Sequence, residues 1–273
     1  MKGWWLVALI PAAVSAFAAT PAAATGYDIS LAGLVDPQNK DPSARADKDS
    51  FDLIVMDLGL SLQPRFSGPA STVGSLGFDV GFNLVRTDLT ADSRAAWAKA
   101  VPDPLSTLEI SQVHVRKGLP FSFELGCAVS KLHDSRLWGV AFEVKTAFVE
   151  GYTYVPDIGA RGHISTVIGS RDLAMLGLGG DLLISKSFGI AGMFQFTPYT
   201  GYSYTFVYAT SHVIGRFYES DTAPVPHTLS DSLLSEHRGI VGAALRFSAA
   251  ELAFEMVRND TYTTTGFRVS AIF

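Results

Sequence analysis

Two polar residues with the spacing of one strand face have the clearest potential for chemistry. His163 and Ser165 stand two positions apart in the stretch "GHIST". Because side chains two apart on a strand share a face, the imidazole could act as the base for a hydroxyl nucleophile. Spacing identifies no acidic third member, and the alternative is a non-catalytic polar pair beside Arg161. We therefore assign no catalytic residue from the sequence.

The remaining histidines and the single cysteine do not form a metal-binding pattern. No H-x-H or H-x-x-x-H spacing occurs among the histidines nearest Asp221 and Asp231, which are His212, His227 and His237. Cys127 stands alone, which excludes an intramolecular disulfide and a cysteine-based zinc site. No glycine-rich phosphate loop is present. The sequence therefore predicts no metal and no cofactor, and a net charge of −5 gives no support for nucleic-acid binding.

The first 24 residues have the features of a secretory signal peptide. Lys2 is followed by an apolar stretch from Trp4 to Ala18, and small residues precede the preferred cleavage site after Ala24. The stretch is shorter than the roughly 20 apolar residues that a spanning helix requires. We expect a cleaved signal peptide over 1–24, and the alternative is an N-terminal membrane anchor.

Strand-like alternation dominates the chain from residue 72 onward. In "SLGFDVGFNL", residues 75–84, apolar side chains occupy every second position and Ser, Gly, Asp or Asn stand between them. A period of two indicates a strand with one apolar and one polar face. The same pattern returns in 121–129, 138–148 and 190–209, where the apolar faces are rich in aromatic residues.

These two faces predict contact with lipid rather than with a protein core. The face opposite the apolar one is mostly Gly, Ala and Ser with an occasional charge. Small polar side chains suit a narrow aqueous interior, and a continuous apolar face suits hydrocarbon. Since backbone groups in lipid must be satisfied internally, such strands must close into a barrel. We therefore predict an all-β fold, a closed antiparallel transmembrane β-barrel, with a soluble sandwich or lipocalin-like barrel as the alternative.

About ten strands account for the alternation within the predicted barrel domain, residues 72–273, and twelve are the alternative if 26–34 and 51–62 are also strands. If the first strand starts from the periplasm, the two longest connections, 88–104 and 210–235, both lie on the outer side. That arrangement agrees with the short inner turns and longer outer loops of outer-membrane barrels.

The segment before the barrel, residues 25–71, is expected to plug or cap the periplasmic mouth. Within it, residues 51–62 favour a short helix over a strand, because apolar residues interrupt the strand alternation. Asp49 or Ser50 is the expected N-cap and Gly59 the expected stop.

The last strand carries a resemblance to a known family. In "TTTGFRVSAIF", apolar residues alternate before a terminal aromatic residue, at Phe267, Val269, Ala271 and Phe273. This ending resembles Gram-negative outer-membrane β-barrel proteins, of a porin-like and uncharacterised kind. The resemblance implies a place in the cell outer membrane, contact with outer-membrane lipid, and recognition of this strand by the barrel-assembly machinery. Separately, the His163-x-Ser165 pair resembles that of outer-membrane lipid A deacylases.

The polar strand faces predict a mixed set of charges inside the barrel. The expected lumen-lining residues are Asp79, Asn83, Glu109, Glu124, Glu143, Lys145, Asp181, Arg246, Glu255 and Arg268. Closure of the first strand on the last could bring Asp79 near Arg268. The adjacent final strands could gather Arg246, Glu255 and Arg268. Because buried charges need partners, we expect an internal ion-pair network.

A barrel of this size leaves little free space, since barrels of about eight strands are filled and open porins have roughly 16–18. We therefore expect a packed interior rather than a wide pore. The predicted function is a narrow pore or transport-type barrel for a small solute, or a structural membrane protein, without catalysis. The alternatives are a lipid-modifying hydrolase using His163 and Ser165, and a surface adhesin acting through 88–104 and 210–235.

Overall fold

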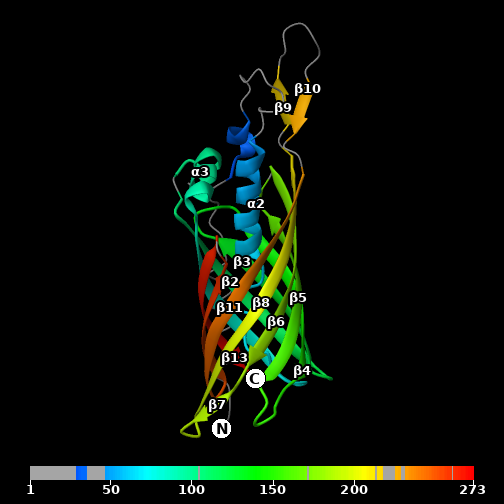
Figure 1. Cartoon of the computed structure of the whole chain (residues 1–273), viewed down its shortest axis with the longest axis vertical. Helices are drawn as coiled ribbons and strands as arrows, with labels where there is room; N and C mark the ends of the chain where they lie inside the picture. The colour runs from blue at the N-terminus through cyan, green and yellow to red at the C-terminus, as the bar shows by residue number, and fades with distance from the viewer. Residues whose placement is uncertain are drawn as a thin grey trace, which may run out of the picture.

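Ten antiparallel strands close into a ring in the part of the chain that the structure describes (Figure 1). The computed structural model describes residues 29–35, 47–103, 105–170, 172–212, 214–217, 225–228, 231–259 and 261–273, so the expected signal peptide lies outside it. The ring strands are β1 (Phe78–Asp88), β2 (Thr107–Leu119), β3 (Phe123–Leu132), β4 (Trp138–Val149), β5 (Asp157–Ile168), β6 (Leu173–Ser185), β8 (Phe194–Ser211), β11 (Ser232–Phe247), β12 (Ala250–Arg258) and β13 (Thr263–Ile272). The predicted fold class is confirmed, with ten strands rather than twelve.

The first and last strands close the ring. β1 pairs with β13 from Asp79↔Ile272 to Asp88↔Thr263. The backbone of Phe273 continues this pairing, because Phe78 and Phe273 exchange two hydrogen bonds of 3.0 and 2.8 Å. Every ring strand is therefore paired on both sides, which is the condition for crossing hydrocarbon without exposed backbone groups.

Among the described residues, three short strands lie outside the ring, and the sequence did not predict them. β7 (Phe188–Ile190) pairs with β8, and β9 (Ile214–Phe217) pairs with β10 (Val225–Thr228) within the 210–235 connection. The hairpin of β9 and β10 extends the connection beyond the barrel wall (Figure 1).

The two ends of the barrel carry different connections. One end bears the 88–104 and 210–235 connections, and the first of these contains the helix α3 (Ala91–Ala100). The other end bears Phe273 and tight connections such as residues 120–122 (Figure 1). We call these ends the helix mouth and the C-terminal mouth. The predicted grouping of the two longest connections at one end is confirmed.

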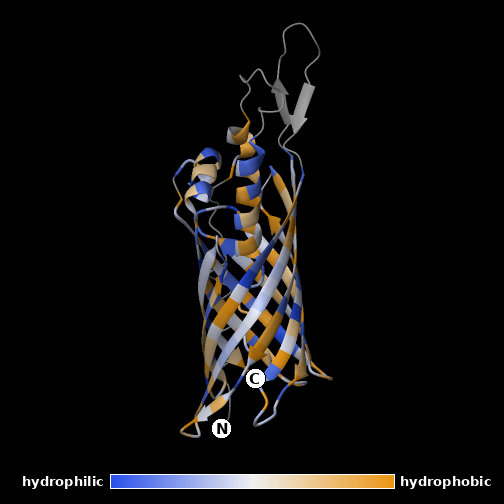
Figure 2. Ribbon diagram, viewed as in Figure 1, coloured by the Kyte–Doolittle hydropathy of each residue, from blue (hydrophilic) through white to orange (hydrophobic). Residues whose placement is uncertain are grey.

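The outer face of the wall is an apolar belt. Phe78, Phe123 and Phe142 are 38%, 43% and 61% exposed, so the large apolar side chains point away from the interior as predicted. Figure 2 shows hydrophobic residues alternating with hydrophilic ones along the strands. Exposed aromatic residues in this number would be unfavourable in water, and their continuity fits a lipid-covered surface.

A helix enters the barrel at the helix mouth. α2 (Lys48–Leu62) contacts β2, β3, β4, β5, β6, β8 and β11, so barrel wall surrounds it. A helix that is buried on nearly all sides is apolar on nearly all sides. This explains why its sequence shows no clean amphipathic period. None of the helices in the described ranges is long and apolar enough to cross a membrane.

The predicted helix is present, but its ends and its place differ from expectation. Asp47 is the N-cap, and its carboxylate accepts a hydrogen bond from Ser50 N at 3.0 Å. The helix continues through Gly59, because the surrounding wall holds it to Leu62. It lies at the helix mouth, not at the opposite mouth that the sequence suggested. The 3-10 helix η1 (Leu31–Leu34) lies beside it, so the described part of 26–34 is not a ring strand.

The polarity of the wall inverts close to the helix mouth. Inside, apolar wall residues form one core with α2, among them Leu108, Ile110, Leu132 and Val207. At the same level the outward positions are polar, among them Arg86, Glu109 and Lys131. This end of the barrel is therefore built like a water-soluble protein, and the rest is built like a membrane protein.

Candidate functional site

Residues 63–73 run from the end of α2 through the lumen to the C-terminal mouth. Near the helix mouth, Gln112 Nε2 donates to the Gln63 carbonyl at 3.3 Å. At the far end, Val73 N donates to Glu124 Oε2 at 3.0 Å, shortly before β1 begins. We call α2 and this extended run, residues 48–73, the plug.

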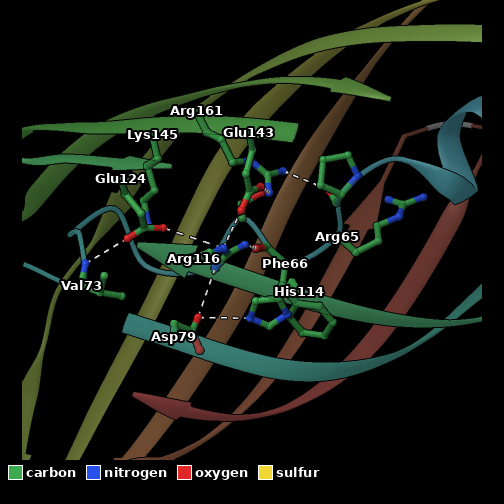
Figure 3. Close-up of polar contacts among 12 residues, drawn as sticks. Arg65, Phe66, Val73, Asp79, His114, Arg116, Glu124, Glu143, Lys145 and Arg161 are labelled. Atoms are coloured by element: carbon green, nitrogen blue, oxygen red, sulfur yellow. Dashed lines mark hydrogen bonds and ion pairs between the residues drawn. The ribbon is translucent and has the colours of Figure 1, made fainter. Parts of the chain in front are cut away.

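Cationic side chains of the wall bind the plug through its main-chain carbonyls. Arg116 Nη2 donates to the Phe66 carbonyl at 2.5 Å (Figure 3), and Lys145 Nζ donates to the Pro69 carbonyl at 2.5 Å. Hydrogen bonds from charged donors are shorter and stronger than neutral ones. The wall therefore binds the plug backbone as well as plug side chains such as Ser67, whose Oγ donates to Asp181 Oδ2 at 3.4 Å.

Acceptors on the wall bind the amides of the same run. Ala70 N donates to Ser185 Oγ at 2.9 Å, and Thr72 N donates to Glu150 Oε2 at 2.9 Å. Since buried backbone groups are costly when unpaired, these bonds let an extended segment stay inside the barrel. The sequence of residues 67–71, "SGPAS", leaves room for them because its side chains are small.

The groups that bind the plug also bind one another. Glu143 accepts from Arg116 Nε at 2.5 Å and from Arg161 Nη1 at 3.0 Å, and Arg161 Nη2 reaches Asp181 Oδ2 at 2.5 Å (Figure 3). All four side chains are nearly fully buried. The internal ion-pair network that the sequence led us to expect therefore lies around the plug, with Glu143 at its centre.

Most of the expected lumen residues lie inside the barrel. The buried ones are Asp79, Asn83, Glu124, Glu143, Lys145, Asp181, Glu255 and Arg268. Arg246 is partly exposed near the C-terminal mouth, where its Nε donates to the Ser248 carbonyl at 3.1 Å.

Glu109 is the exception, because its side chain is 54% exposed on the outer face. β2 extends beyond the apolar belt toward the helix mouth. There its outward residues are polar and its inward residues are apolar, which is the reverse of the pattern within the belt. Assigning Glu109 to the interior therefore exchanged the predicted inner and outer faces along the whole of β2. That inversion concealed His114 and Arg116, which are buried in the lumen.

The charges of the closing strands have direct partners that the sequence did not predict. Asp79 Oδ2 lies 3.2 Å from His114 Nε2, and Arg268 Nη2 forms an ion pair with Glu251. Asp79 and Arg268 line the same small space and interact electrostatically, so the expected approach of these two residues is confirmed. Glu251 could have been found from the sequence, because it has the same strand parity as Glu255 four residues later.

Arg246 and Arg268 line the same small space, as expected, but Glu255 is not among the residues that line it. The Tyr199 hydroxyl donates to Glu255 Oε2 at 3.0 Å. Tyr199 lies on the inner face of β8, in a run whose other tyrosines point outward. Tyr199 has the same strand parity as the inward Thr197 and Ser203, so the alternation along this run could have placed it in the lumen.

His163 and Ser165 are both buried in the lumen. Within the described ranges, neither ring nitrogen of His163 has a hydrogen-bond partner. The imidazole lies over Gly179 of β6, where any Cβ would collide with it. Since a nucleophile and its base must share a hydrogen bond, this geometry does not support the deacylase-like pair.

The space left beside the plug is small. A cavity of about 70 Å³ at the C-terminal mouth is lined by Lys145, Arg246, Glu251 and Arg268, among others. Such a volume suits water or a very small solute. In the described part of the chain, no group of three or more His, Cys, Asp or Glu side chains could hold a metal ion.

A buried carboxyl group joins α2 to α3 at the helix mouth. Trp97 Nε1 donates to Asp57 Oδ2 at 2.8 Å, and Ser93 Oγ donates to Asp57 Oδ1 at 3.3 Å. Burial raises the pKa of Asp57 to about 7, although these two hydrogen bonds act in the opposite direction. The usual value for this group is 3.8, so docking of the helices depends on pH.

We expect α3 to dock more tightly at pH 5 than at pH 8. Between 3.8 and about 7, an exposed Asp57 loses its proton while the buried one keeps it, so docking weakens as the pH rises. Hydrogen exchange of residues 91–100 should therefore be faster at pH 8 after correction for intrinsic rates. Asp57→Asn should remove the difference, because the amide cannot ionise, and a variant with unchanged pH dependence would contradict this assignment.

The belt, the closed ring and the filled polar interior together define a membrane-spanning β-barrel. No known protein family matches the chain, and no curated protein matches its sequence. Among solved structures, it is similar to Ail, the attachment invasion locus protein of Yersinia pestis, with 9% identity over 72% of this chain and 97% of that chain and a TM-score of 0.30.

Two further solved structures are similar at the same level. The KdgM porin in complex with disordered oligogalacturonate has 8% identity, covers 71% of this chain and 98% of that chain, and has a TM-score of 0.33. The beta domain of the Bordetella autotransporter BrkA has 10% identity, covers 73% and 100%, and has a TM-score of 0.39. With values this low, the assignment to the class depends on the geometry of this chain itself.

Proposed function

We propose that the chain is an outer-membrane β-barrel that its own plug keeps closed, and that it serves as a structural, surface-exposed membrane protein. The observation that carries this proposal is the binding of the plug backbone by buried charges of the wall, at Arg116 and Lys145. A lumen filled in this way leaves no room for a wide pore. In this proposal the helix mouth faces outward and outer-membrane lipid covers the belt.

The proposed assembly signal is the last strand. Phe267 and Val269 project into the belt, and Phe273 pairs with Phe78 where the ring closes. A strand that both closes the ring and ends in an exposed aromatic residue is available for recognition before closure. We propose the barrel-assembly machinery as its partner.

A transport-type barrel is the second candidate. It is favoured by the small side chains of "SGPAS" in the narrow part of the lumen, because such a segment could move without large steric barriers. The charged cavity at the C-terminal mouth would then receive a small solute.

A surface adhesin is a third candidate, and fewer residues of the 88–104 connection are available for binding than the sequence suggested. In the 88–104 connection, Trp97 and Ala96 pack inward, while Asp92, Arg94 and Lys99 of α3 lie toward solvent. Deleting the connection would damage the core, so substitution of exposed residues is the appropriate test of binding. The side chains of 213–230 lie outside the described residues.

Single-channel recording separates the first two candidates. We expect the full mature chain in a planar bilayer to give no defined conductance step, because the plug fills the lumen. A chain lacking residues 47–73 keeps all ten ring strands and serves as the positive control, with stepwise conductance expected. Regular steps from the full chain would overturn the closed-barrel proposal and favour transport.

A further inference from the structure

Three side chains on the outer face of the barrel form a chain of contacts. Ser111 Oγ lies 2.7 Å from His133 Nε2, and His133 Nδ1 lies 3.8 Å from Glu109 Oε2. His133 and Glu109 are 41% and 54% exposed, so the group is accessible from outside. A hydroxyl, an imidazole and a carboxylate in this order have the arrangement of a serine nucleophile with its base and orienting acid.

The strand register explains why these residues meet. Glu109 and Ser111 are two positions apart on β2 and share its outer face. The pairing of β2 with β3 ends at Ile110↔Leu132, which places residue 133 beside them. His133 N also donates to the Glu109 carbonyl at 2.9 Å, so the backbone around the imidazole is fixed.

The group lies at the edge of the apolar belt. Ser111 pairs with Leu84 of β1 and Glu109 pairs with Arg86, so the change from apolar to polar outward residues occurs beside Ser111. The acyl ester bonds of membrane lipids lie at this same boundary, between the hydrocarbon and the headgroups. A lipid in the outer leaflet would therefore present its ester carbonyl at the level of Ser111 Oγ.

Two depressions meet at Glu109 and His133. One has a volume of about 400 Å³ and is lined by apolar belt residues that include Leu84, Phe254 and Phe267. The other has a volume of about 160 Å³ and extends toward the connections of the helix mouth. An amphiphile with its acyl chain in the first and its polar part in the second would place its ester between them.

We propose that Ser111, His133 and Glu109 hydrolyse acyl esters of membrane lipids. Ser111 Oγ attacks the ester carbonyl carbon while its proton passes to His133 Nε2, and Glu109 stabilises the resulting imidazolium. The carbon–oxygen bond to the lipid alcohol then breaks, and that alkoxide takes the proton from His133. His133 then takes a proton from water, and the hydroxide attacks the acyl-serine carbonyl. The bond from the acyl carbon to Ser111 Oγ breaks, Ser111 Oγ takes the proton back from His133, and the fatty acid leaves.

A cation beside the site completes the chemistry. Arg86 lines the larger depression and opposes Glu109 in register, and its guanidinium, which pairs with Asp88 at 3.3 Å in this structure, would turn toward the developing oxyanion. This activity goes beyond the closed-barrel function and is independent of it. It departs from the prediction of a non-enzymatic barrel, and it uses residues remote from His163 and Ser165.

The test measures fatty-acid release by the full mature chain from three substrates. Phosphatidylethanolamine vesicles, vesicles containing lipopolysaccharide, and p-nitrophenyl butyrate distinguish a phospholipid, a glycolipid and a free ester as the acyl source. A fluorophosphonate probe should add its mass to Ser111. We expect release from at least one lipid substrate.

The variants identify the residues responsible. Ser111→Ala should reduce release to background and abolish labelling, and His133→Asn should lower the rate at least about 100-fold. Ser235→Ala is the matched control, because Ser235 also faces outward two residues from an exposed histidine, His237, and should leave the rate unchanged. Circular dichroism melting should be unaltered in all three variants.

Two outcomes would overturn the proposal. One is a folded wild-type chain that releases no fatty acid from any of the three substrates. The other is a folded Ser111→Ala variant that keeps the wild-type rate. Hydrolysis of p-nitrophenyl butyrate alone would overturn the assignment of membrane lipid as the substrate.

Discussion

Replacing Glu143 with alanine is expected to lower the free energy of unfolding by about 3–5 kcal/mol. Glu143 is the shared partner of Arg116 and Arg161 at 2.5 and 3.0 Å, and all three side chains are buried. Removing the carboxylate takes away the partner that both guanidinium groups share, and leaves Arg161 with Asp181 at 2.5 Å and Arg116 with Asp79 and Glu124 at 3.9 and 3.8 Å. The chain is unfolded with guanidinium chloride in lipid vesicles and followed by tryptophan fluorescence. A shift of the denaturation midpoint at an unchanged m-value gives the change in the free energy of unfolding.

An exposed ion pair provides the control for this prediction. Arg86 and Asp88 lie 3.3 Å apart with side chains that are 59% and 57% exposed. Asp88→Ala should cost no more than about 1 kcal/mol, because water screens the pair. If Glu143→Ala were no more costly than Asp88→Ala, the buried network would not be what holds the plug and wall together.

Replacing Trp97 with alanine is expected to weaken the docking of α3 on α2 by about 3–5 kcal/mol. Trp97 is fully buried in the core of the helix mouth, and its Nε1 is a donor to Asp57. The substitution therefore opens a cavity and removes a hydrogen bond from a buried carboxyl group. Hydrogen exchange of residues 48–62 and 91–100 should become faster together.

A second substitution at the same position separates packing from hydrogen bonding. Trp97→Phe keeps most of the ring but lacks the N–H donor, so a cost of about 1–3 kcal/mol is expected. Wild-type exchange in Trp97→Ala would show that α3 docks without its aromatic anchor. Faster exchange confined to 91–100 would show that α2 is held by the wall alone.

The lumen could be read from the sequence only where each strand keeps one polarity along its length. Asp79, Glu124 and Asp181 were found because their strands alternate cleanly within the belt. β2 passes from the belt into the helix mouth, and its polar outer residues there led to the error at Glu109. Alternation along a strand shows which residues share a face. It does not show whether lipid or water covers the outer face at a given height of the barrel.

The contacts among Ser111, His133 and Glu109 on the outer face were not predicted, because they depend on the pairing of two strands. Ser111 and Glu109 share one strand, but His133 joins them only through the register of β2 against β3. Sequence spacing instead drew attention to His163 and Ser165, which share a strand face without sharing a hydrogen bond. Proximity along a strand therefore does not establish a hydrogen bond, whereas the contact of Ser111 with His133 arises from the register of two strands.

The sequence alone indicated the closed barrel, about ten strands with twelve as the alternative, the apolar belt and a helix within 51–62. These follow from local periodicity, because each strand must present one face to hydrocarbon regardless of its neighbours. Only the tertiary structure decided that residues 63–73 fill the lumen and that Glu143 stands at the centre of the charges around them. The wall binds this run through backbone groups that every residue possesses, so its small side chains carry no local signal of the contact.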